Sequence, residues 1–199
     1  MSMRWEDEPD PEALRSAQNS LSTNPVQALK KLRELANRGS TMSKIYLADA
    51  YEKGVGGAPD LAACEEWLRR ASETGSSYAT FRLGKLYLKI RQQARAYDAF
   101  CASASKSYAP AQTVLAEMYF QGVPIKRDVD RAIDLLEQAA TQGHVYAKGR
   151  LAQLYLHGMS GYFFGGVLHP NRFIRGLWLW STGFYDALVS DPADERFQI

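Results

Sequence analysis

Apolar residues recur along most of the chain at helical spacing, and the pattern itself repeats. The motif Leu-small-x-apolar-Tyr occurs four times, beginning at Leu47, Leu83, Leu115 and Leu151. Successive leucines are 36, 32 and 36 residues apart. A second motif, Ala-Ala/Ser-x-x-Gly, ends at Gly39, Gly75, Ser107 and Gly143, with the same three spacings. Two motifs that share one irregular spacing indicate a stacked-repeat architecture.

Each repeat predicts two helices, and the unit between residues 60 and 87 shows them most clearly. Asp60 is placed to cap a helix whose apolar residues continue at helical spacing until Gly75 closes it. A second helix then runs from Ala79 through Tyr87. We expect the small residue of the first motif, Gly84 in this unit, to let two helix backbones approach closely.

The two ends of the chain depart from this pattern. Asp10-Pro11 and Asn24-Pro25 pair a capping residue with proline, which predicts helices over about 11–21 and 25–38. A glycine-rich loop is expected from Gly158. We therefore divide a single domain into an N-terminal tail and capping helix (1–24), the repeats (25–158) and a divergent, aromatic-rich C-terminal helix pair (159–199).

The combined motifs resemble the Sel-1-like repeat, a relative of the tetratricopeptide repeat. The match is carried by Gly54, Gly56, Asp60, Trp67, Gly75, Ala79, Leu83, Gly84 and Tyr87, and again by Gly122, Val123, Asp128, Ala132, Ala139, Ala140 and Gly143. It covers about two thirds of the chain. Departures are a connector four residues shorter after Tyr87, Ser107 in place of glycine, and Lys31 at a tryptophan position. The resemblance implies an all-α fold, a right-handed α-solenoid of antiparallel helix pairs, whose members mostly serve as adaptors for other proteins.

In such a solenoid the first helix of each pair lines a concave groove, where peptides or helices bind. Counting from each closing glycine, the exposed inward positions give the candidate partner-binding residues Tyr46, Asp49, Lys53, Tyr78, Arg82, Lys85, Lys89, Glu117, Tyr146, Arg150 and Gln153. We interpret them as a surface for an acidic protein segment, with Arg82 and Arg150 as carboxylate-binding forks. The alternative is a solvated charged face without a partner.

The C-terminal segment concentrates aromatic residues beyond the needs of one helix pair. Those singled out are Phe163, Phe164, Phe173, Trp178 and Trp180. They are interpreted as a hydrophobic cap on the repeats. A homodimer or partner interface is the second interpretation, and contact with a membrane surface is the weakest of the three.

Composition and charge narrow the class further. The 199 residues include 24 basic and 22 acidic side chains, a formal net charge of +2 that gives no overall footprint for nucleic acid. Neither a secretory signal nor a membrane-spanning apolar run is visible, so we expect a cytoplasmic protein. The two cysteines, Cys64 and Cys101, are interpreted as small apolar side chains.

No constellation in the sequence points to catalysis. The three histidines, His144, His157 and His169, lack a metal-binding spacing, and no nucleophile elbow or Walker loop is present. We therefore expect no metal, no cofactor and no enzymatic activity, and interpret the chain as an adaptor for another protein. The alternative is a groove that binds a cell-wall-type or other small molecule, or a hydrolytic enzyme with its site there.

Overall fold

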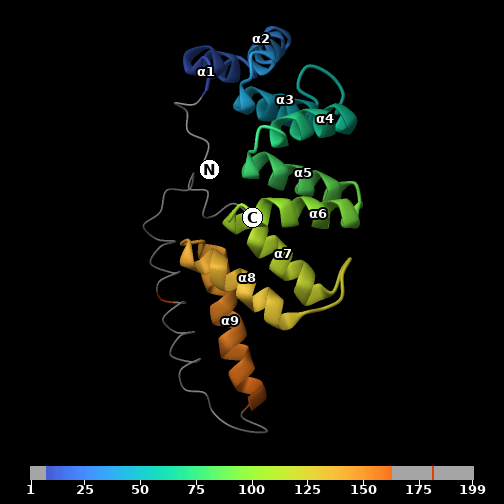
Figure 1. Cartoon of the computed structure of the whole chain (residues 1–199). Coiled ribbons are helices and arrows are strands. Elements are labelled where there is room, and N and C mark those ends of the chain that lie inside the picture. The colour runs from blue at the N-terminus through green and yellow to red at the C-terminus, as the bar shows by residue number, and fades with distance from the viewer. Residues whose placement is uncertain (1–7, 163–180, 182–199) are drawn as a thin grey trace. The chain divides into compact units, whose positions relative to one another are not determined.

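A computed structural model describes residues 8–162 and residue 181, and every regular element within them is a helix. The chain divides into two compact units, Met1–Ala102 and Ser103–Ile199, which we call the first and second unit and describe separately. The helices, labelled in Figure 1, are α1 (Pro11–Asn19), α2 (Pro25–Asn37), α3 (Thr41–Lys53), α4 (Leu61–Ser72), α5 (Ser77–Lys89), α6 (Gln93–Ala104), α7 (Ala109–Gln121), α8 (Val129–Thr141) and α9 (Val145–Tyr162). The all-α expectation is confirmed.

The helix starts follow the capping residues that the sequence marks. Asp10, Asn24 and Asp60 each accept a hydrogen bond from the backbone N–H three residues further on, at 3.0, 3.4 and 2.9 Å. Ser40 and Ser76 do the same for α3 and α5. Each bond satisfies one of the N–H groups that a helix start leaves without a partner inside the helix.

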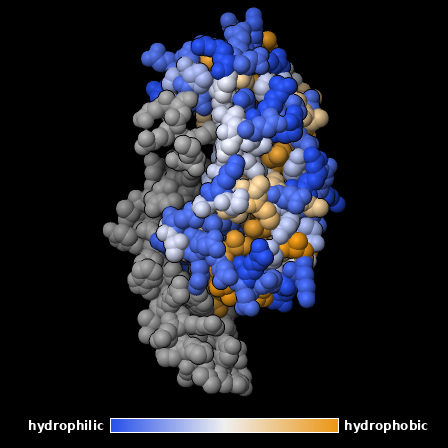
Figure 2. Space-filling model, in the orientation of Figure 1, coloured by the Kyte–Doolittle hydropathy of each residue, from blue (hydrophilic) through white to orange (hydrophobic). Residues whose placement is uncertain are grey.

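The core of the first unit lies at the motif positions. Helix α1 contributes Leu14 and Ala17 to a buried cluster with Leu32, Leu35, Ala36 and Leu47. In the view of Figure 2 the surface over α1 and α2 is mostly hydrophilic. Helix α1 thus packs an apolar side against α2 and turns a polar side outward, which is how a terminal helix protects the core of a repeat stack.

A close contact between α5 and α6 explains the glycine of the second repeat. A Cβ atom built at Gly84 would lie 2.6 Å from Cε1 of Phe100. The repeat register aligns Phe100 with Leu68 and Leu136, and aligns Gly84 with Ala48 and Ala116. The repeat with the larger residue, Phe100 instead of leucine, is therefore also the repeat with the smaller residue, Gly84 instead of alanine. The predicted close approach at Gly84 is present, but the group that needs the space is a side chain rather than a helix backbone.

Ser107, which stands where the other repeats have glycine, takes the backbone conformation of a glycine. Its φ is 59°, while Gly39, Gly75 and Gly143 have φ of 103°, 89° and 87°. All four lie in the left-handed region that residues with a Cβ atom rarely adopt. The departure in sequence thus leaves the local fold unchanged and places backbone strain at one serine.

The second unit packs α7 against α8 and α8 against α9. Its core again holds the motif residues, with Ala116, Leu136 and Leu151 almost wholly buried. The predicted end of the repeats at residue 158 falls inside α9, which continues to Tyr162. The loop expected from Gly158 is therefore helical over residues 158–162, because glycines inside an established helix cost only about 1 kcal/mol each and do not by themselves end it.

Cys64 is fully buried, and burial raises the pKa of its thiol to about 12. Neither Cys64 nor Cys101 forms a disulfide. Among the described helices, none combines the length and the apolar character needed to cross a membrane. The five aromatic residues singled out near the C-terminus lie outside the described residues.

Candidate functional site

The predicted binding residues of the first unit lie on one side of α3 and α5, which we call the polar face. It carries Tyr46, Asp49 and Lys53 on α3 and Tyr78, Arg82, Lys85 and Lys89 on α5. Spacings of three and four residues place each set on one side of its helix. The tyrosines, Asp49 and Arg82 are half-buried, whereas the three lysines are exposed.

Arg82 links the two helices of this face through acidic side chains of α3. Its guanidinium donates to Asp49 and, at 3.4 Å, to Glu52. A further bond of 3.3 Å reaches the hydroxyl of Tyr78, and only 19% of the Arg82 side chain is exposed. Burial opposes the charge of Arg82, but the hydrogen bond and charge of Asp49 outweigh it and raise the pKa.

Lys89 extends the same network at its exposed end. Its Nζ donates to Glu52 at 2.8 Å. This hydrogen bond is the main reason why the pKa of Glu52 is lowered, with the charge of Arg82 contributing in the same direction. Lys85 takes a different position, with its Nζ 5.8 Å from the centre of the Phe81 ring. The polar face therefore holds an ordered set of charges of both signs.

The second unit repeats the central contact. Arg150 on α9 donates to Glu117 on α7 through Nε at 2.7 Å and Nη2 at 3.4 Å. Its Nη1 donates to Gln153 at 3.0 Å, and the guanidinium lies 5.4 Å from the centre of the Phe120 ring. The hydrogen bond to Glu117 raises the pKa of Arg150. Asp49–Arg82 and Glu117–Arg150 are each 33 residues apart, so they are equivalent contacts between successive repeats.

The structure thus brings Asp49 to Arg82 and Glu117 to Arg150, as parts of one recurring ion pair. Both arginines that the sequence offers as forks for an incoming carboxylate already hold a carboxylate of their own chain. Tyr146 is exposed on α9. Sequence analysis missed Glu52 and Phe120. The shared 33-residue separation of acid and arginine was the available signal for the pairing.

Glu8 also lies beside the polar face, although it precedes the first repeat. Its carboxylate accepts a hydrogen bond from the backbone N–H of Met42 at 3.0 Å and another from the hydroxyl of Ser40. Both partners belong to the start of α3. One turn further along that helix stands Tyr46 of the polar face, whose pKa is raised by burial first, and also by Asp49, Tyr78 and Glu8. Glu8 therefore lies at the N-terminal end of the polar face.

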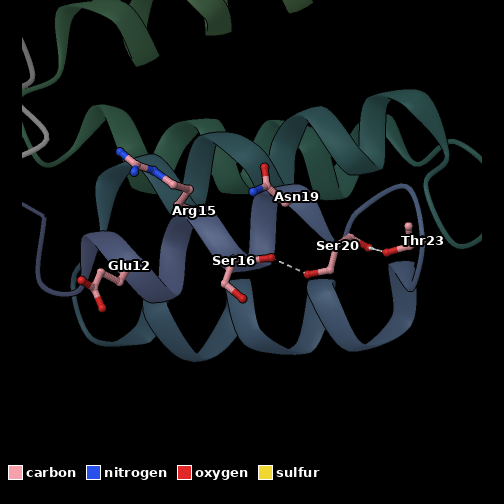
Figure 3. Close-up of a pocket in the computed structure, with 6 residues that line it drawn as sticks. All are labelled: Glu12, Arg15, Ser16, Asn19, Ser20 and Thr23. Carbon is pink, nitrogen blue, oxygen red and sulfur yellow. Dashed lines mark hydrogen bonds between the residues drawn. The ribbon is translucent and has the colours of Figure 1, made fainter.

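A separate polar depression lies along α1 (Figure 3). It is lined by Glu12, Arg15, Ser16, Asn19, Ser20 and Thr23. These residues come from α1 and the turn that follows it, and the hydroxyl of Ser20 donates to the carbonyl of Ser16. No histidine is among these lining residues, so neither serine has an imidazole beside it that could act as a general base. The depression is distinct from the polar face.

Metal-binding chemistry has no candidate within the described part of the chain, which holds no group of three or more histidine, cysteine or carboxylate side chains suited to an ion. His144 has a structural role instead. Its Nδ1 accepts a hydrogen bond from the backbone N–H of Ala147 at 3.3 Å, at the start of α9. It occupies the position of Ser40 and Ser76 in the earlier repeats and, like them, accepts a hydrogen bond at a helix start.

Paired helices, a recurring inter-repeat ion pair and repeat spacings of 36, 32 and 36 residues define a helical-repeat protein. More particularly, it resembles the Sel1-like repeat proteins, because residues 42–76 and 109–144 match the Sel1 repeat family model. Members of this family generally mediate contacts between proteins, and their fold is typically a scaffold without enzymatic activity.

Known relatives agree with this assignment. Chitin synthase regulatory factor 3 of Schizosaccharomyces pombe is 26% identical over 63% of this chain and 15% of its own length. A putative sel1-like repeat-containing protein of Acanthamoeba polyphaga mimivirus is 25% identical over 69% of this chain and 26% of its own. The chain therefore spans about a quarter or less of the length of these two curated relatives.

Solved structures show the same fold. A Sel1 repeat protein from Oxalobacter formigenes superposes with a TM-score of 0.72 at 19% identity, over 92% of this chain and 77% of that one. A protective antigen of uropathogenic Escherichia coli strains with an SLR fold gives a TM-score of 0.70 at 22% identity, over 87% and 38%. The predicted Sel1-like solenoid class is confirmed by these matches.

Proposed function

We propose that the chain is a protein-interaction adaptor that holds an acidic segment of a partner protein against the polar face. The observation that carries this proposal is the charge of that face in the first unit. Lys53, Arg82, Lys85 and Lys89 stand against only Asp49 and Glu52. Four positive charges against two negative ones give this face a net positive charge, which favours a negatively charged partner.

The ion pairs support this function by orienting the face before a partner arrives. Arg82 is held by Asp49, Glu52 and Tyr78, so its guanidinium has little rotational freedom left to lose on binding. Bound carboxylates also retain acceptor capacity for donors of a partner. We therefore assign Arg82 to organising the face, and assign direct contact with the partner to the exposed lysines and the tyrosines around it. Arg150 has the equivalent organising role in the second unit.

A regulatory setting is consistent with this proposal. The relative from Schizosaccharomyces pombe is named as a regulatory factor of chitin synthase. The proposal for this chain concerns only the contact, in which an extended acidic segment lies across α3 and α5.

The test is a double charge reversal, Lys85→Glu with Lys89→Glu, in the full chain. Lys30→Glu with Lys31→Glu on α2 is the matched control, because both lysines are exposed and lie outside the polar face. Proteins captured from a lysate of the source cells by each immobilised chain are compared quantitatively. We expect partners held by the wild type and by the α2 variant, and lost by the α5 variant. Equal capture by all three chains would refute a role for the polar face.

A further inference from the structure

We infer that Trp180, in the chain's own C-terminal segment, packs over Gly149 on α9 and completes a fourth repeat. The inference goes beyond the proposed function and is independent of it, because it concerns neither the polar face of the first unit nor a partner. What carries it is an open position on α9, at a place where the three earlier repeats hold a buried side chain.

The open position lies two residues before the leucine of the first motif. In the earlier repeats it holds Ile45, Phe81 and Thr113, which are 2%, 1% and 4% exposed. In α9 it holds Gly149, which is exposed. A Cβ atom built at Gly149 would meet nothing within 4 Å among the described residues. The fourth repeat therefore lacks both the side chain at this position and the group that would cover it.

In the earlier repeats this position faces the second helix of its own repeat. The ring of Phe81 on α5 lies 5.7 Å from the ring of Phe100 on α6. Ile45 on α3 belongs to one buried cluster with Ala71 on α4. Since α9 takes the place of α3, α5 and α7 in the fourth repeat, Gly149 marks the side of α9 that a following helix should cover.

The second helices α4, α6 and α8 share one spacing on their buried side. A small residue is followed four positions later by a large apolar residue, and three positions after that by another small one. The residues, each no more than 1% exposed, are Cys64, Leu68 and Ala71 in α4, Ala96, Phe100 and Ser103 in α6, and Ala132, Leu136 and Ala139 in α8. Within the sequence of residues 163–199, this spacing occurs once, as Gly176, Trp180 and Gly183.

The sizes of the two inferred partners are complementary. Trp180 is larger than the leucine or phenylalanine at its place in the earlier repeats, and Gly149 is smaller than every residue at its own place. The glycine thus leaves room for an indole ring. Alanine and tryptophan together are still smaller than Ile45 and Leu68 together, so a methyl group at position 149 fits beside the ring, whereas a large side chain does not.

The residue that follows Trp180 agrees with this register. Ser181 is helical and exposed. At its place the earlier second helices have Arg69, Cys101 and Glu137, none of which is buried. A helix that turns Trp180 toward α9 would likewise leave Ser181 outside the contact.

The test combines substitutions at the two positions in the full chain, with urea unfolding followed by circular dichroism. Gly149→Ile should lower the urea midpoint by about 0.5–1 M, because the new side chain takes the space of the indole ring. Adding Trp180→Leu should raise the midpoint again, since it recreates the pair Ile45 and Leu68. Adding Trp178→Leu is the matched control and should not, because Trp178 lies two residues away, on the opposite side of a helix.

The opposite result is equally definite. If nothing covers position 149, Gly149→Ile should raise the urea midpoint, because isoleucine favours a helix more than glycine does. That result, or equal rescue by Trp180→Leu and Trp178→Leu, overturns the inference.

A second measurement leaves α9 unchanged. Acrylamide quenches the fluorescence of exposed tryptophans more strongly than that of buried ones. Trp180→Phe should therefore raise the quenchable fraction of the emission, and Trp178→Phe should lower it; the reverse order overturns the inference. Light scattering shows whether the contact lies within one chain. We expect a monomer, whereas a dimer that Trp180→Leu dissociates would assign the contact to a second copy and overturn the inference.

Discussion

Replacing Gly84 with alanine sets two opposite effects against each other at one position of α5. In an open helix interior the change from glycine to alanine stabilises a protein by about 1 kcal/mol. Here the new methyl group would lie 2.6 Å from Cε1 of Phe100, with Cδ1 at 2.9 Å and Cζ at 3.0 Å. Overpacking of this kind costs about 1–3 kcal/mol. We therefore expect Gly84→Ala to lower the free energy of unfolding by about 1 kcal/mol.

A second substitution relieves the clash and tests its cause. Phe100→Leu alone should cost about 1–2 kcal/mol, because it removes a ring that packs 5.7 Å from the ring of Phe81. Together the two changes recreate the alanine and leucine found at the aligned positions of the first and third repeats. The double variant should then be more stable than the sum of the single effects predicts, by about 2 kcal/mol.

Urea unfolding of the four chains, followed by circular dichroism, supplies these free energies. Gly149→Ala in α9 is the matched control, because a Cβ at Gly149 meets nothing within 4 Å. That change should raise the free energy of unfolding by up to about 1 kcal/mol. If Gly84→Ala stabilises the chain as Gly149→Ala does, or if the two changes at 84 and 100 are additive, the ring contact does not explain the glycine.

Two further changes address the backbone and the charges. Ser107→Gly should raise the free energy of unfolding by about 0.5 kcal/mol, since the release of left-handed strain outweighs the freedom that glycine adds to the unfolded chain. Ser107→Ala, which keeps the Cβ atom, should not raise it. The lowered pKa of Glu52 predicts a contribution to stability that is present above the ordinary carboxyl value of 4.5 and is lost as the pH falls below it. Between about pH 6 and about pH 3, the Glu52→Gln variant should therefore lose less stability than the wild type. If the urea midpoints of the two chains fall by the same amount over this range, the hydrogen-bonded Glu52 carboxylate does not stabilise the fold.

Repeats made the fold predictable, because both motifs specify packing. Leu47 and Ala48, which are motif residues, are fully buried. The length of α9 was not predictable from the same signals. Its glycines suggested a break after residue 157, but a helix that has already formed can continue through glycine at modest cost.

The candidate site was predictable only in part, for a geometric reason. Helical spacing places Asp49 on one helix and Arg82 on another, but it does not reveal that the guanidinium reaches back across the repeat boundary. Glu52 was missed because it joins this contact from outside the chosen positions on α3. Glu8 precedes the first repeat, so no periodic signal could associate it with Met42.

The ion pairs between successive repeats also fix the order in which the repeats can be joined. Asp49 meets Arg82, and Glu117 meets Arg150, across 33 residues in each case. If the second repeat were duplicated in tandem, the geometry would set Lys85 of one copy against Arg82 of the next, and two positive charges would replace an ion pair. The repeats of this chain therefore differ in the charge that they present to the next repeat. A designed extension that copies the second repeat would regain the ion pair with an acidic residue at position 85.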